Sequence, residues 1–207
     1  MRPRVLWWGA CACIGAGLTL LAQSAGVESY RVAGRSMEPA LFAGDLLVFR
    51  SGRPGESARA RYRPMRGDVV LFRLRPGGVG MVKRVIGLPG DTVSVRGGRL
   101  HLNGAPLVER YLPNIRSAGI EPPHDWHWAF LVPGALDHRY APTPGSWGPI
   151  VVPSGSVFVL GDNRAHSGDS RVFGFVELHD VVGMPERLVP SFRHMMFALN
   201  RRLTALP

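Results

Sequence analysis

The feature that most constrains this chain is an uncharged apolar run near its N-terminus, Val5–Ala22 (VLWWGACACIGAGLTLLA). At a rise of about 1.5 Å per residue, a helix over residues 5–27 nearly matches a hydrocarbon core of roughly 30 Å. Arg2 and Arg4 precede the run, so the positive-inside rule places the N-terminus in the cytoplasm. We therefore expect a short cytoplasmic tail over residues 1–4 and a single transmembrane anchor over residues 5–27.

A cleaved secretory signal is the alternative interpretation of this run, because Ala22, Ser24 and Ala25 provide small residues where a cleavage site needs them. The apolar run is longer than the usual signal core of about 7–15 residues, which favours a retained anchor. Both interpretations place the rest of the chain outside the cytoplasm. We expect a single-pass protein of the inner or plasma membrane with its folded domain on the extracytoplasmic side.

After the apolar run, the sequence predicts one mostly β, antiparallel domain over residues 28–190. Short apolar stretches alternate with turns rich in Gly and Pro, which number 26 and 18 in the chain. Gly97-Gly98 and Asn103-Gly104 can supply the positive φ angles of tight hairpins, so residues 91–110 should form an antiparallel meander. The expected strands are LLVF (46–49), VVLF (69–72), MVKRVI (81–86), TVSV (92–95), RLHL (99–102), PIVVP (149–153) and SVFVL (156–160).

Three further segments have distinct compositions. Residues 51–65 are rich in Arg without apolar periodicity, which predicts an exposed loop, and residues 111–149 should form a loop-rich insertion over the main sheet. Residues 191–207 should form a basic amphipathic segment, too short to span a membrane. A surface or core-closing helix is expected there, with a helix lying in the membrane interface as the alternative. Its apolar positions are Phe192, Met195, Met196, Leu199 and Leu203, opposite Arg193, Arg201 and Arg202.

Charge and cysteine content give two general expectations, one about binding partners and one about disulfides. Lys and Arg number 25 against 15 Asp and Glu, so the surface should attract the phosphates of lipid head groups or of nucleic acid, and charge alone does not choose between them. Cys11 and Cys13, the only cysteines, both lie inside the apolar run. We therefore expect no disulfide in the folded domain.

A serine and a lysine are the first candidates for chemistry. Ser36 stands in GRSMEPAL just after the apolar run, where a serine is more often only a turn residue. Strand periodicity places Lys83 on the same face as Met81 and Val85, where burial favours the neutral amine. Lowering the pKa from about 10.4 to near 8 takes roughly 3 kcal/mol, within what burial supplies. A neutral lysine can accept the proton of a serine hydroxyl, although a lysine stem that only covers the sheet is the simpler alternative.

The third candidate is the loop GDNRAHSGDSR at residues 161–171, which follows a predicted strand. It alternates Asp and Arg with short hydroxyl side chains. Such a loop is either a solvated turn or a set of ion pairs and hydroxyls that orient a lysine.

In combination, these stretches resemble the bacterial type I signal peptidases, of serine protease family S26. The resemblance runs from the apolar segment to about residue 183. Its motifs are SMEP (36–39), GDLLVF (44–49), RGDVVLF with MVKRVIGLPGD (between 66 and 91) and GDNRAHSGDSR (161–171), in the family's order. The resemblance implies a membrane-bound serine endopeptidase that removes signal peptides from exported proteins through an acyl-enzyme, on a mostly antiparallel β domain with an apolar face toward the membrane.

The resemblance also implies roles for individual residues. Ser36 matches the nucleophile, Lys83 the general base and Ser167 the serine that positions the lysine amine. Gly34 stands where many relatives have a serine whose hydroxyl stabilises the oxyanion, so we expect the backbone N–H of Ser36 to serve instead. Supporting ion-pair positions are matched by Arg84, Asp162, Arg164, Asp169 and Arg171.

The same resemblance implies neither metal nor other cofactor. The expected partners are the signal peptides of preproteins, the lipid bilayer and the secretion machinery, and not nucleic acid. Substrates should present small residues before the cut, in an extended strand that pairs with a sheet edge.

Other readings of local motifs are weaker. His166 lies between Asp162 and Ser167, but neighbours along one loop rarely converge on one reacting atom. His124, Asp125 and His127 have the composition of a metal cluster, yet such residues are usually polar loop positions. The triplet at residues 66–68, Arg-Gly-Asp, is explained as the turn before a strand.

Three functional alternatives stay open beside signal peptide removal. Self-cleaving repressor proteins and specialised conjugative-pilus peptidases use a similar Ser/Lys architecture, although the apolar run and the lack of a helix-turn-helix pattern argue against a repressor. A catalytically inactive, membrane-anchored basic binding protein is the alternative outside the enzymes.

Overall fold

The computed structural model describes residues 27–50, 63–112, 120–134 and 140–204. Short strands dominate, and each strand pair is antiparallel. The strands are β1 (Val27–Arg31), β2 (Leu46–Arg50), β3 (Val69–Phe72), β4 (Met81–Gly87), β5 (Thr92–Arg96), β6 (Arg99–Leu102), β7 (Ala105–Pro106), β8 (Ser146–Val151), β9 (Ser156–Leu160), β10 (Val176–Glu177), β11 (Val181–Gly183) and β12 (Pro185–Val189). The helices are η1 (Asp125–Phe130), η2 (Arg164–His166), α3 (Ser170–Phe173) and α4 (Phe192–Thr204).

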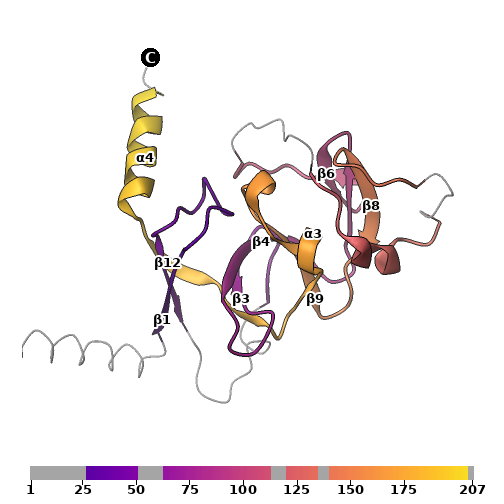
Figure 1. Cartoon of the computed structure of the whole chain (residues 1–207), viewed down its shortest axis with the longest axis horizontal. Coiled ribbons are helices and arrows are strands. Elements are labelled where there is room, and N and C mark those ends of the chain that lie inside the picture. The colour runs from indigo at the N-terminus through magenta and orange to yellow at the C-terminus, as the bar shows by residue number, and fades with distance from the viewer. Residues whose placement is uncertain (1–26, 51–62, 113–119, 135–139, 205–207) are drawn as a thin grey trace, which may run out of the picture.

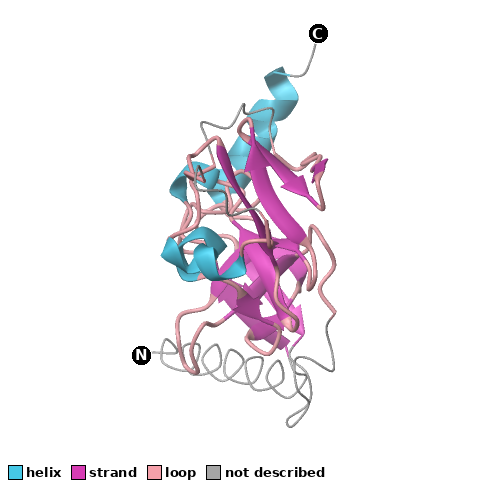
Figure 2. Ribbon diagram, turned by 90° about the vertical axis from the view of Figure 1, so that its right-hand side faces the viewer, coloured by secondary structure: helices cyan, strands magenta, loops and turns pink. Residues whose placement is uncertain are grey.

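The described strands form three sheets, which Figures 1 and 2 show from two sides. The central sheet has the order β10-β9-β4-β3-β11, and the other two have the orders β1-β2-β12 and β7-β6-β5-β8. The prediction of a mostly β, antiparallel fold is confirmed for the described residues. The long helix α4 projects from the end of β12 at one side of the molecule (Figure 1).

Both faces of the central sheet are covered, which explains the apolar run of β9. Phe158 and Leu160 pack in the same cluster as Val93 and Ile150 of the neighbouring sheet. Val157 and its alternate neighbour Val159 pack in a second cluster, with Val70 and Val85. A strand segment that alternates between two cores needs apolar side chains on both faces, as residues 157–160 have. All five residues of β9 are buried.

The predicted hairpins are present. Gly97 and Gly98 turn β5 into β6 with φ angles of 56° and 71°. Asn103 and Gly104 turn β6 into β7 with φ angles of 51° and 82°. The antiparallel meander expected over residues 91–110 is therefore confirmed.

The expected insertion over residues 111–149 is more regular than predicted. Strand β8 begins at Ser146 and pairs with β5, so the boundary at residue 149 is wrong. Trp147 is buried and donates a hydrogen bond to the carbonyl of Ile120 (2.9 Å). Of the loop expected at residues 51–65, only residues 63–65 lie in the described part of the chain.

The expected membrane anchor lies almost entirely outside the part of the chain that the structure describes. Residues 1–26, which contain nearly all of the expected anchor, lie outside the described residues, and Val27 is the first residue of β1. Over the described ranges, we find no helix that is long and apolar enough to span a membrane.

The amphipathic segment forms α4 as predicted, but its apolar positions do not close a core. Phe192, Met195, Met196 and Leu199 are exposed. Instead, Phe197 packs against Phe42, with 5.0 Å between ring centroids.

Candidate active site

Ser36 lies on a compact loop between β1 and β2, which we call the Ser36 loop (residues 32–45). The amide of Val32 donates to the carbonyl of Asp45, and the amide of Gly44 donates to the carbonyl of Val32, both at 2.8 Å. The amide of Leu41 donates to the carbonyl of Met37 (2.9 Å), which forms a turn just after Ser36. The closed base and this internal turn limit the positions that Ser36 can adopt.

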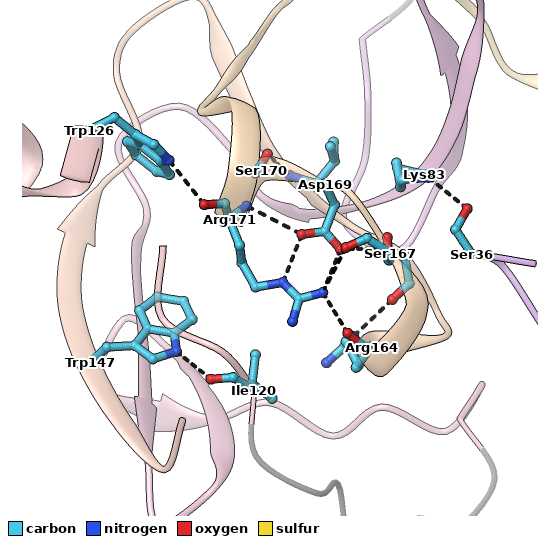
Figure 3. Close-up of polar contacts among 12 residues, drawn as sticks. Ser36, Lys83, Ile120, Trp126, Trp147, Arg164, Ser167, Asp169, Ser170 and Arg171 are labelled. Atoms are coloured by element: carbon cyan, nitrogen blue, oxygen red, sulfur yellow. Dashed lines mark hydrogen bonds and ion pairs between the residues drawn. The ribbon is translucent and has the colours of Figure 1, made fainter. Parts of the chain in front are cut away.

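Lys83 lies in the middle of β4, where its neighbours on the strand are also buried. Its side chain is held against the Ser36 loop: Nζ donates hydrogen bonds to Ser36 Oγ (2.7 Å) and to the carbonyl of Val82 (3.1 Å). Figure 3 shows the Lys83 and Ser36 side chains pointing toward each other. The structure therefore brings together the two residues that the sequence analysis selected as nucleophile and base.

The surroundings of Lys83 change its acidity. Burial lowers the pKa of the Lys83 amine below its ordinary value, and the negative charges of Asp169 and Asp162 oppose this only in part. The direction is the one expected from the sequence, because an ammonium group loses hydration in such a position. A larger fraction of the amine is thus neutral and able to accept a proton.

The loop at residues 161–171 holds Ser36 from the other side. The amide of Asn163 donates to the carbonyl of Ser36 (2.9 Å), and Asn163 Nδ2 donates to the carbonyl of Arg35 (3.2 Å). A Cβ added to Gly161 would lie 2.5 Å from the Ser36 carbonyl oxygen. Only a glycine allows this close approach, and neither Asn163 nor Gly161 was singled out from the sequence.

Asp169 and Arg171 form a buried ion pair inside this loop (Figure 3). Arg171 Nε donates to Asp169 Oδ1 (2.8 Å), and its Nη2 donates to Asp169 Oδ2 (2.9 Å) and to the carbonyl of Arg164 (2.8 Å). The amide of Gly161 donates to Asp169 as well (3.0 Å). Asp169 therefore fixes the start and the end of the loop at once.

A second buried ion pair joins the loop to β4. Arg84 donates twice to Asp162, at 2.8 and 2.6 Å, and the ring of Tyr111 lies 4.0 Å from the Arg84 guanidinium carbon. Arg164 pairs with Glu109, which also accepts a hydrogen bond from the hydroxyl of Tyr111 (2.5 Å). Burial opposes the charge on Arg84, yet the pairing with Asp162 raises its pKa.

These contacts support the sequence-based assignment of Arg84, Asp162, Arg164, Asp169 and Arg171 to ion pairs. Glu109 and Tyr111, which were not predicted as site residues, complete this network from the segment that follows β7.

Ser167, which the resemblance implies positions the lysine amine, makes no hydrogen bond to it in this structure. Its Oγ is buried and has no hydrogen-bond partner among the described residues. This Oγ lies close to Gly161, where an added Cβ would stand 2.2 Å from it. The second hydrogen bond of Lys83 goes to the Val82 carbonyl instead.

A cavity of about 150 Å3 opens directly beside Ser36 and Lys83. Gly34 borders it, and a Cβ added there would meet no atom within 4 Å. The cavity lies between the end of β1, the Ser36 loop and the start of β4. Its lining consists of Tyr30, Val32, Ala33, Gly34, Ser36, Met37, Gly80, Met81, Val82 and Lys83.

The alternative motifs considered in the sequence, namely His166, the pair His124 and His127, and the Arg-Gly-Asp triplet, make contacts within the fold. His166 is exposed, and its Nδ1 lies 3.2 Å from Asn163 Oδ1. The Nδ1 atom of buried His127 lies 2.8 Å from the carbonyl of His124, and the described residues contain no group of three or more potential metal ligands. Arg66 of the Arg-Gly-Asp triplet pairs with Asp91 (2.9 Å), within the fold.

Comparison with known proteins gives one consistent result. The model of the family "Signal peptidase, peptidase S26" matches residues 5–189. Signal peptidase I P of Bacillus subtilis subsp. natto is 31% identical over 94% of this chain and 93% of its own. Signal peptidase I of Bacillus caldolyticus is 32% identical over 95% of both chains, and that of Bacillus licheniformis is 35% identical over 85% of this chain and 83% of its own. A crystal structure of a signal peptidase I from Enterococcus faecalis V583 aligns with 59% of this chain and 97% of its own, at 33% identity and a TM-score of 0.43.

The chain belongs to the S26 family of signal peptidases. This confirms the resemblance found in the motifs and places the protein among the serine peptidases, an enzyme class that fits the contact between Ser36 and Lys83.

Proposed function

We propose that the protein is a membrane-bound signal peptidase I that cleaves preproteins with Ser36 as nucleophile and Lys83 as general base. The observation that carries the proposal is the distance of 2.7 Å between Lys83 Nζ and Ser36 Oγ, at a lysine that is only 5% exposed. Geometry and a lowered pKa are the two properties that a base of this kind needs.

The proposed reaction is acyl transfer in two halves. Neutral Lys83 takes the hydroxyl proton of Ser36 while Oγ attacks the scissile carbonyl, and the ammonium of Lys83 then gives this proton to the leaving amine. The peptide bond breaks, and an ester joins the signal peptide to Ser36. Lys83 next takes a proton from water, which attacks the ester and releases the signal peptide. Ser36 recovers its proton from Lys83.

The oxyanion of this reaction needs a hydrogen-bond donor near Ser36. Gly34 has no side chain to donate, so we assign this role to the backbone N–H of Ser36. The base of the Ser36 loop and the bond from Asn163 to the Ser36 carbonyl support a fixed orientation of this amide. The residues of the site can carry the chemistry without a metal or another cofactor.

The substrate is a preprotein with small residues before the cut. The confined cavity of about 150 Å3 beside Ser36, lined in part by Tyr30 and Met37, supports this choice because it limits the size of the side chain that binds there. We place the signal peptide as an extended strand between β1 and β4, where backbone groups can pair with it.

The proposed location is the cell membrane, with a single anchor over residues 5–27, a cytoplasmic N-terminus and the catalytic domain outside. The apolar run in the sequence supports the anchor, and two arginines before it support the orientation. The lipid bilayer and the secretion machinery are then the expected surroundings of the enzyme.

Ser36→Ala and Lys83→Ala test the proposal in detergent-solubilised full-length protein with a purified preprotein. Both variants should lose turnover by a factor of about 10³ or more while their circular dichroism stays that of wild type. A wild type that does not cleave, or a folded variant that cleaves normally, overturns the assignment. Cleavage restricted to one pilin-like substrate would favour the specialised conjugative-pilus peptidase.

A further inference from the structure

Helix α4 contacts the Ser36 loop through three side chains in its N-terminal half, those of Arg193, His194 and Phe197. Arg193 Nη2 lies 3.5 Å from Glu38 Oε1, and His194 Nδ1 lies 2.7 Å from Asp45 Oδ2. The third, Phe197, packs on Phe42. These contacts join segments that are about 150 positions apart, and none of their loop residues belongs to the ion pairs that hold the 161–171 loop.

Asp45 connects α4 to the base of the Ser36 loop. Its carboxylate is fully buried and accepts hydrogen bonds from the amide of Phe42 (2.9 Å), the amide of Ser191 (2.7 Å) and His194 Nδ1 (2.7 Å). The carbonyl of the same residue accepts the bond from Val32 that closes the loop. A displacement of this carboxylate therefore moves both ends of the loop.

His194 contributes packing as well as a hydrogen bond. Its ring centroid lies 5.1 Å from that of Phe42, and its side chain is 19% exposed. The helix thus holds the loop segment that follows Ser36, whereas Asn163 holds Ser36 itself from the other side. With two supports, the loop has little freedom to change the distance between Ser36 Oγ and Lys83 Nζ.

We propose that His194 of α4 is a positioning residue for the Ser36 nucleophile, acting through Asp45 and the Ser36 loop. This inference rests on the proposed function, since it assigns His194 to the support of the same catalytic pair. A shift of about 1 Å in a reacting group can lower the rate on the order of 100-fold. Loss of the His194 hydrogen bond should therefore reduce kcat, while KM, set by the substrate cleft, stays unchanged.

Two substitutions separate the hydrogen bond from packing. His194→Leu fills a similar volume against Phe42 but donates nothing, and His194→Asn keeps an amide donor near the position of Nδ1. The matched control is His179→Ala, because His179 is exposed and contacts Glu177 and Asp180 instead of the Ser36 loop. Full-length proteins in detergent are compared for kcat and KM on one preprotein, with Ser36→Ala as the inactive reference.

We expect kcat to fall about 10-fold or more in His194→Leu, with KM within about twofold, and to recover in His194→Asn to within about threefold of wild type. Wild-type kcat in folded His194→Leu overturns the inference, and so does an equal loss in both variants. If His194→Leu does not fold while His194→Asn is active, His194 is structural only, which also overturns it. Failure of wild type to cleave, unlike these outcomes, overturns the proposed function itself and this inference with it.

Discussion

Gly161 lies directly against the backbone of Ser36, so that an added Cβ would stand 2.5 Å from the Ser36 carbonyl oxygen. Real Cβ atoms do not approach backbone oxygens so closely, and the opposing atom here belongs to the residue that carries the nucleophile. A side chain at residue 161 must therefore displace either the Ser36 loop or the 161–171 loop.

Gly161→Ala should lower kcat by about 100-fold, because the displaced Ser36 no longer lies within hydrogen-bond distance of Lys83. Gly168→Ala in the same loop is the matched control, since a Cβ at Gly168 would meet no atom within 4 Å. Preprotein cleavage and thermal unfolding of both variants check the prediction. Equal kcat in the two variants would show that the close approach of Gly161 to the Ser36 backbone is not needed for catalysis.

Ser167→Ala should separate activity from stability. The buried Ser167 hydroxyl has no hydrogen-bond partner among the described residues, so its removal should leave the melting temperature unchanged or slightly higher. If the hydroxyl turns to the Lys83 amine during the reaction, as the family resemblance implies, kcat falls about 10-fold or more. Steady-state kinetics and thermal unfolding of one preparation measure both quantities. Full activity in the variant would remove Ser167 from the catalytic group.

Asp45→Asn should change the pH dependence of stability. Burial acts to raise the pKa of Asp45, but the hydrogen bonds from Phe42, Ser191 and His194 outweigh it and hold the pKa below its ordinary value. The stabilisation from the ionised carboxylate is thus complete above the unfolded pKa of about 3.9 and is lost as the pH falls through the lower folded value.

Melting temperatures from pH 7 down to pH 3 test this expectation. Wild type should exceed Asp45→Asn by several degrees at pH 7, and the difference should shrink toward pH 3. Glu177→Gln is the control, because its carboxylate is exposed. A difference that stays constant with pH would exclude Asp45 ionisation as its source.

The parts of the site that follow from local pattern could be predicted from the sequence. A lysine on the apolar face of a predicted strand is a local signal, and it made Lys83 a candidate base. The family resemblance then implied its role as the base. Paired turn residues likewise predicted the hairpins on either side of β6. The alternation of Asp and Arg after β9 fitted either a solvated turn or ion pairs, and only the family resemblance implied ion pairs there.

The remaining parts depend on contacts between distant segments. Arg164 pairs with Glu109, 55 positions away, and His194 with Asp45, 149 positions away, and no local pattern encodes either pair. Strand β8 was only partly recognised because Gly148 and Pro149 lie inside it. A proline is tolerated there since β8 is an edge strand of its sheet.

The pH dependence of cleavage tests the central claim most directly. Burial lowers the pKa of the Lys83 amine. A plot of kcat/KM for a preprotein against pH should therefore rise through a midpoint below the ordinary lysine value of about 10.4 and level off above that midpoint. Lys83→Arg keeps the positive charge but cannot act as a base in this range, so it should be inactive at every pH. A rate independent of pH between about 6 and 10, or activity in a folded Lys83→Arg protein, would contradict the assignment of Lys83 as the base for Ser36.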